Sequence, residues 1–193
     1  MAVTSVRRAS GSEETAATSG ADYLARVAEI APALAAAAAE IDRRRELPEA
    51  IVDALIERGL FRLLLPRSLA GAELLPAQYI PIIEAIAEID ASTAWCINQN
   101  SGCSMTAALL APEIAREIFG GPRGILAWGP DLPGAGRGVA VEGGIRVTGR
   151  WGFATGSRHA TWLGCRCCQA SKVAAARKPG DREHCPALLI CAV

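Results

Sequence analysis

Apolar side chains recur at helical spacing along the first part of the chain, and the pattern changes to strand-like alternation beyond Gly121. Ser19 followed by Asp22 resembles a capping box and predicts a long helix that reaches about Ile41, with Pro32 as a point where it could bend. The other predicted helices begin at Pro48 and stop at Gly59, run from Pro76 to Ile89 with Pro81 near the start, run from about Ser92 to Leu110, and run from Pro112 to Phe119.

Runs of β-branched and aromatic residues, separated by Gly and Pro, predict strands in the rest of the chain. The predicted strands are GILAW, RGVAVEG, IRVTGRWGF, HATWLGCRCC and PALLICAV. Gly143 and Gly144 lie between the second and third of these, and both tolerate positive φ, which favours a hairpin. In an extended IRVTGRWGF strand, Trp151 and Phe153 would share one face.

Helices followed by strands favour the α+β class with two domains. We predict a disordered leader over residues 1–20, an all-helical domain over residues 21–121, and an incomplete antiparallel β-domain, either a barrel or a sheet, over residues 122–193. The leader is rich in Ser, Thr, Gly and Ala and contains no apolar run of the kind found in signal peptides. We therefore expect a cytoplasmic protein.

The charge balance argues against two classes of partner. Lys and Arg together number 20, as do Asp and Glu, so no excess of positive charge attracts nucleic acid. The longest apolar run, around Ala31 to Ala39, is too short to span a membrane and is followed by charged residues. We expect neither nucleic acid nor a membrane as a partner.

The seven cysteines are expected to be thiols rather than disulfides in a reducing cytoplasm. Residue types that bind zinc gather near the end of the sequence: Cys165, Cys167, Cys168, His184, Cys185 and Cys191. The spacing C-x-C-C differs from the usual C-x₂-C, and on a strand the middle cysteine would share a face with the first one but not with the third. We expect no metal site, and treat these cysteines as small buried apolar side chains.

Aromatic residues are concentrated in GGIRVTGRWGFATGSRHATW, from Gly143 to Trp162, although they make up only 5% of the chain. Two interpretations stay open on the residues alone: the rings fill a sheet core, or they form a surface on which a planar cofactor ring packs. The chain has no GxxxxGK[ST] loop before a helix and no G-x-S-x-G turn, which disfavours nucleotide binding of the P-loop kind and hydrolase chemistry.

From Leu47 to about Gln169, the chain resembles the N-terminal half of the acyl-CoA dehydrogenase superfamily of flavoproteins. It is most similar to the flavin-dependent hydroxylase branch, the oxygenase component of two-component monooxygenases. The resemblance is carried, in family order, by LPEAIVDALIERGLFRLLLPRSLAG, IPIIEAIAEIDASTAW, EIAREIFGG and GGIRVTGRWGFATGSRHATW. It implies a helical domain, a β-domain and a C-terminal four-helix bundle, with FAD or FMN held between the last two.

The resemblance also implies site residues. Phe153 and Thr155 match an aromatic and a threonine that contact the flavin ring in the family. The implied flavin-binding set is Ala127, Trp128, Gly129, Trp151, Phe153 and Thr155. The helix around Trp95 lines the substrate side in the family, so Trp95, Asn98 and Cys103 are the candidates for a substrate pocket. For Trp95 and Cys103 the alternative is core packing between helices, and for Asn98 it is a position facing solvent.

The activity implied by the resemblance is hydroxylation of an aromatic or polyketide-type small molecule, with reduced flavin supplied by a separate reductase. AWGPDLPGAGRG stands where the dehydrogenases carry TEPxxGSD, which favours this branch over acyl-CoA dehydrogenation, the first alternative. Family members continue into a bundle that completes the flavin site and forms a homo-oligomer interface. We expect the present sequence to be truncated before it, which leaves catalytic residues unassigned and makes a non-catalytic fragment with weak or no flavin binding the second alternative.

Overall fold

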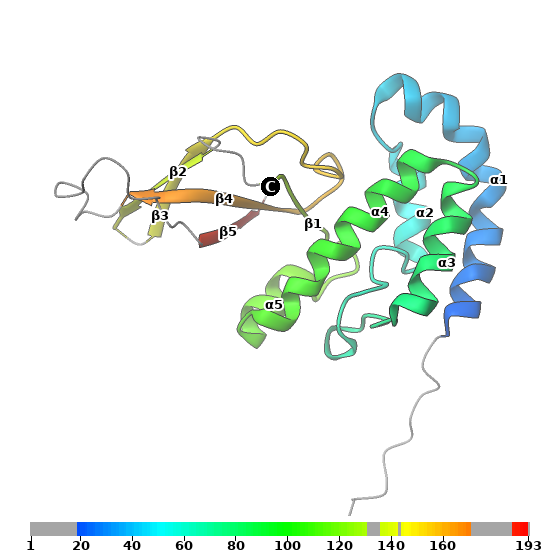
Figure 1. The fold of residues 1–193 in the computed structure, drawn as a ribbon, viewed down its shortest axis with the longest axis horizontal. Helices are drawn as coiled ribbons and strands as arrows, with labels where there is room; N and C mark the ends of the chain where they lie inside the picture. The colour runs from blue at the N-terminus through cyan, green and yellow to red at the C-terminus, as the bar shows by residue number, and fades with distance from the viewer. Residues whose placement is uncertain (1–18, 131–135, 143, 171–186, 193) are drawn as a thin grey trace, which may run out of the picture.

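The computed structural model describes residues 19–130, 136–142, 144–170 and 187–192, in which helices come first and strands follow (Figure 1). The helices are α1 (Gly20–Arg44), α2 (Glu49–Glu57), α3 (Pro76–Ala87), α4 (Ala91–Ser104) and α5 (Pro112–Phe119), with short 3₁₀ turns η1 (Arg67–Leu69) and η2 (Met105–Leu109). The strands are β1 (Leu126–Trp128), β2 (Gly136–Val141), β3 (Gly144–Gly149), β4 (Trp162–Ala170) and β5 (Ala187–Ala192). This order confirms the α+β class.

The helices begin where the sequence signals place them. The Ser19 hydroxyl accepts a hydrogen bond from the Asp22 amide, and the Asp22 carboxylate accepts one in return from the Ser19 amide, which completes the predicted capping box of α1. Asp90 caps α4 by accepting the Thr93 amide at 2.6 Å. The predicted helix to Leu110 is divided in two, because Thr106 Oγ1 donates to the Cys103 carbonyl at 2.7 Å just where α4 gives way to η2.

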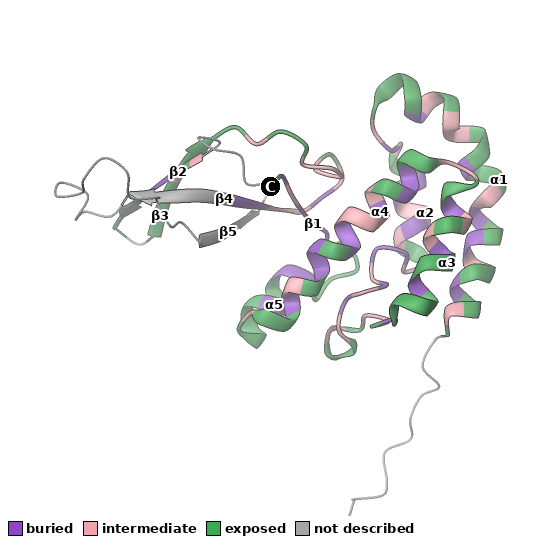
Figure 2. Cartoon of the chain, in the orientation of Figure 1, coloured by how far each residue is buried: buried purple, intermediate pink, exposed green. Residues whose placement is uncertain are grey.

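The apolar core lies among α1, α2, α3 and α4 and continues to β1, whereas much of the β2–β3 hairpin is exposed (Figure 2). Leu34, Ile82 and Ile97 bring α1, α3 and α4 together with no exposed surface. Burial of each such side chain contributes about 1.5–3 kcal/mol to folding. Helix α4 therefore has a fixed position, and it lies between helices α1 to α3 and the sheet (Figure 1).

The sheet is mixed, which corrects the prediction of a wholly antiparallel one. Strands β2 and β3 form the predicted antiparallel hairpin, with Val141 opposite Gly144. Strand β4 also pairs antiparallel with β5, but it runs parallel to both β1 and β2. The reason is the connection after β3: residues 150–161, called here the return segment, carry the chain back beside β1 before β4 begins at Trp162.

The predicted strand IRVTGRWGF is wrong in its second half. Strand β3 ends at Gly149, and the return segment that follows is irregular, with a turn over residues 155–159. Phe153 has φ 56° and Gly156 has φ 79°, values that no extended strand can contain. Trp151 and Phe153 therefore do not share one face of a strand.

Candidate functional site

A cavity of about 360 Å³ opens where β1, β3, β4 and the return segment meet. We call it the sheet cavity. Two of the predicted flavin-binding residues, Gly129 and Trp151, line it. Sequence reasoning missed other residues of its wall, among them Arg150, Ser157 and Leu163. The alternating pattern gave no signal for them, because it placed Arg150 in a strand.

Two glycines let the Trp151 side of the cavity close up. A Cβ at Gly136 would lie 2.0 Å from Cζ2 of Trp151, so the indole of Trp151 packs directly on the backbone of β2. A Cβ at Gly129 would lie 2.4 Å from the carbonyl oxygen of Gly152, so the end of β1 is held against the start of the return segment. Both contacts need residues without a side chain.

Phe153 lies outside the described lining of the sheet cavity and is 84% exposed. Its backbone is in the left-handed region, with φ 56°, which is an outlier for a bulky side chain. The Thr155 amide donates to the Phe153 carbonyl at 2.9 Å and holds the turn in that shape. Thr155 is half-buried, next to Gly156. The aromatic ring is thus held in solvent by a backbone conformation that costs free energy.

Two more members of the predicted flavin set lie on β1. Ala127 is 0% exposed and belongs to the helical core, so its side chain has no surface to offer a ligand. Trp128 is half-buried and packs against the smaller core of Phe119, Leu126 and their neighbours.

The three predicted substrate-pocket residues on α4 have different surroundings. Trp95 is 57% exposed, whereas Cys103 is buried in the smaller core. Asn98 accepts a hydrogen bond from the Tyr79 hydroxyl at 2.9 Å. Burial raises the pKa of the Cys103 thiol to about 11, and the neighbouring Trp128 backbone amide opposes that shift. Cys103 therefore stays a neutral thiol beside β1.

Asn100 and His159 join α4, β1 and the return segment, and sequence reasoning missed both. Asn100 is 2% exposed, and its Nδ2 donates to the Leu126 carbonyl at 3.1 Å. Its Oδ1 lies 3.0 Å from Nε2 of His159. The available signal was a polar residue on the inner face of a helix and a histidine within the aromatic stretch, but neither one identifies the other.

The hydrogen bonds of Asn100 fix the proton on His159. The Leu126 carbonyl only accepts, so the amide nitrogen of Asn100 faces it and the amide oxygen faces His159. Nε2 of His159 must then carry the hydrogen. Burial lowers the pKa of His159 from 6.5 to about 4, so its ring is neutral at pH 7.

This burial predicts a pH dependence of stability. Between pH 6.5 and about pH 4, His159 binds a proton in the unfolded chain but not in the folded one. The stabilisation is therefore fully present above pH 6.5 and is lost as the pH falls to about 4. Because the ring is partly exposed, we expect a loss of about 1–2 kcal/mol in the free energy of unfolding rather than the roughly 3 kcal/mol of the whole shift.

Urea unfolding of the wild-type chain and of His159→Gln at a series of pH values measures this loss. Carboxylates titrate in the same range in both proteins, so the difference between them isolates the histidine. Parallel pH profiles would contradict the prediction.

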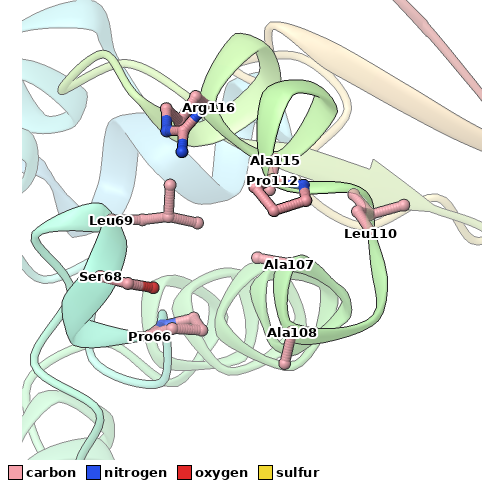
Figure 3. A pocket seen from close by; sticks show the side chains of 9 residues that line it. All are labelled: Pro66, Ser68, Leu69, Ala107, Ala108, Leu110, Pro112, Ala115 and Arg116. Atoms are coloured by element: carbon pink, nitrogen blue, oxygen red, sulfur yellow. The ribbon is translucent and has the colours of Figure 1, made fainter.

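Figure 3 shows a second cavity, of about 350 Å³, between η1, η2 and α5. Small apolar side chains such as Ala107 and Pro112 face Leu69 across it, and Arg116 lies at its edge. Its described lining contains none of the predicted site residues. Among the side chains that the structure describes, no three of His, Cys, Asp or Glu come together as metal ligands, and of the predicted cysteine-rich set only Cys165 has a described side chain. No described helix has the length and apolar character to cross a membrane.

Comparison with known proteins gives a consistent result. Residues 22–116 match the family described as acyl-CoA dehydrogenase, N-terminal domain. The chain is 32% identical over 152 residues to an indole-3-acetate monooxygenase of Pseudomonas putida, a match that covers 78% of this chain and 36% of the relative. It is 29% identical over 131 residues to the oxygenase subunit HsaA of a flavin-dependent monooxygenase of Rhodococcus jostii, covering 68% of this chain and 34% of the relative.

The fold comparison agrees with the sequence comparison. The structure of XiaF from Streptomyces sp. in complex with FADH₂ and glycerol superposes with a TM-score of 0.70 at 31% identity, over 78% of this chain and 38% of that one. The chain thus spans about a third of the length of the curated relatives it matches. The resemblance to flavin-dependent monooxygenases of the acyl-CoA dehydrogenase fold is confirmed.

Proposed function

We infer that this chain, whose residues 22–116 match the acyl-CoA dehydrogenase N-terminal domain, forms the flavin-facing part of the oxygenase component of a two-component monooxygenase. The observation that carries this inference is Phe153. Its ring is 84% exposed on a backbone with φ 56°, so the fold sustains a strained conformation to hold an aromatic face in solvent. A planar apolar ligand that stacks on this face would bury it.

The sheet cavity, whose lining includes Trp151 and Ala154 close to Phe153 in the sequence, fits a flavin ring. The indole of Trp151 and the side chain of Leu163 give the sheet cavity apolar walls, and Arg150 brings a positive charge to it. The ring system of a flavin is apolar over its faces and carries polar atoms along one edge, so it needs both kinds of group. Stacking geometry between aromatic rings adds about 0.5–1.5 kcal/mol to the free energy of area burial.

The side chains have separate parts in this proposal. Phe153 would stack on the flavin ring, and the Thr155 hydroxyl, two residues later, would hydrogen-bond to its edge and influence its electronics. Ser157 adds a second hydroxyl on the cavity side. Half-buried Trp151 would keep water from the apolar side of the ring. A bound reduced flavin supplies the electrons with which molecular oxygen is activated.

The substrate class follows from the relatives rather than from the cavity. The Pseudomonas putida relative is named for indole-3-acetate, and another relative, from Rhizobium sp., is named as a resorcinol hydroxylase; both compounds are small aromatic molecules. The resorcinol hydroxylase is named as an oxygenase component and the Rhodococcus jostii relative as an oxygenase subunit, which supports a separate reductase as the source of reduced flavin. We propose a small aromatic substrate and such a reductase for the protein to which this sequence belongs.

Titration of the purified wild-type chain with FAD and FMN, each oxidised and dithionite-reduced, tests the proposal. We expect quenching of flavin fluorescence and a shift of the visible absorption band on binding of at least one form. A chain that changes neither signal and retains no flavin on gel filtration would defeat the proposal.

A further inference from the structure

We propose that Asn100 and His159 form a latch that positions the turn of residues 153–155 for contact with flavin. The inference rests on the proposed function and deepens it. Neither residue is among the described lining of the sheet cavity, so both are positioning residues that act through the turn.

The turn is suspended between two anchor points of the return segment. At the first, the carbonyl of Gly152 lies against Gly129 at the end of β1. At the second, Gly156 and His159 lie on Asn100 of α4. Residues 153–155 are the whole span between Gly152 and Gly156, so these contacts set where Phe153 and Thr155 lie.

Asn100 makes the second anchor rigid because it bonds in two directions from a helix in the core. Its amide nitrogen holds the Leu126 carbonyl at 3.1 Å, and its amide oxygen holds His159 at 3.0 Å. One buried side chain therefore holds both β1 and the return segment against the same position on α4. A buried amide with both polar atoms bonded has one favoured orientation, since any other leaves a polar atom unsatisfied.

The packing around this bond is close on both sides. A Cβ at Gly156 would lie 2.4 Å from Oδ1 of Asn100, so the chain passes directly over the amide, with the φ of 79° that glycine permits. The ring of His159 packs against the buried Phe61, with 5.2 Å between ring centroids. Apolar contact and the hydrogen bond together hold the imidazole in place.

A turn that is already ordered binds a ligand more tightly, because less conformational entropy is lost on binding. Loss of the latch should leave the residues that touch flavin intact but let them move. The predicted signature is weaker flavin binding combined with faster exchange of the backbone amides in residues 150–161, while the helices stay protected.

Two variants of His159 separate hydrogen bonding from packing. His159→Phe keeps an aromatic ring against Phe61 but removes the donor to Asn100, whereas His159→Gln restores an N–H donor. We expect His159→Phe to raise the Kd for reduced FAD or FMN about tenfold and to speed amide exchange in residues 150–161, as loss of one buried hydrogen bond does. His159→Gln should recover both properties toward the wild-type values.

Tyr79→Phe is the matched control, because it removes a hydroxyl that bonds to side chains of α4, Asn98 and Ser101, but leaves the hydrogen bonds of Asn100 and His159 in place. It should change neither the exchange of residues 150–161 nor the flavin Kd. The latch is refuted if His159→Phe matches the wild-type chain in exchange, or if His159→Gln is as defective as His159→Phe. Should the wild-type chain bind no flavin, the proposed function fails, while the exchange measurements still decide whether the latch exists.

Discussion

Replacing Phe153 with glycine is expected to weaken flavin binding at least about tenfold while leaving the folded chain as stable as the wild type or about 0.5–1 kcal/mol more stable. The ring is 84% exposed, so its removal forfeits little burial in the flavin-free protein. The φ of 56° strains any residue with a Cβ, and glycine adopts it freely. A side chain that adds nothing to stability but is needed for binding is the signature of a ligand contact.

Phe153→Tyr is the control, because it keeps the aromatic face and should bind flavin within about twofold of the wild type. Flavin titration by fluorescence gives the Kd of each variant, and urea unfolding gives its stability. Wild-type flavin affinity in Phe153→Gly would remove Phe153 from the site. A large loss of stability in that variant would mean instead that the ring packs on the protein.

The helices could be predicted from the sequence because their signals are local. The capping box at Ser19, the cap at Asp90 and the proline at the start of α5 all act within one turn of the chain. The hairpin of β2 and β3 was equally predictable, since two adjacent glycines separate two alternating runs.

The parallel pairing of β4 was not predictable, because it depends on where the return segment delivers the chain. The end of β3 was not predictable either, because residues Arg150 to Phe153 alternate as residues in a strand do. The chain leaves the strand there because Gly152 and Gly156 contact residues elsewhere in the fold. A contact between residues far apart in the sequence produces no periodic pattern of apolar and polar residues from which it could be predicted.

The same difference between local signals and long-range contacts applies to the candidate site. Gly129 and Trp151 were predicted by resemblance and do line the sheet cavity, whereas their roles toward flavin stay predictions. Asn100 and His159 are 59 positions apart, and only the fold brings them within 3.0 Å. In this chain the residues proposed to touch a ligand match a family motif, whereas nothing in the sequence pairs the two residues proposed to hold them in place.

Gly129→Ala is expected to destabilise the fold by about 2–3 kcal/mol, the upper part of the usual range of about 1–3 kcal/mol when a side chain is forced into a packed site. Its Cβ would lie 2.4 Å from the carbonyl oxygen of Gly152 and 3.4 Å from Cβ of Trp151. The first obstacle is backbone, which cannot rotate away as a flexible side chain can. To relieve the overlap, the return segment must move off β1, and the wall of the sheet cavity moves with it.

Gly152→Ala is the matched control from the other side of the same contact. A Cβ at Gly152 meets nothing within 4 Å, so this variant should lose less than about 1 kcal/mol. Urea unfolding measures both, and flavin titration should show a higher Kd for Gly129→Ala alone. Equal stabilities would mean that the Gly152 carbonyl does not press on Gly129 and that this contact does not anchor the turn. Unequal stabilities with equal flavin affinity would keep the anchor as a feature of folding but separate it from the site, because a wall that moves without affecting flavin is not part of the flavin pocket.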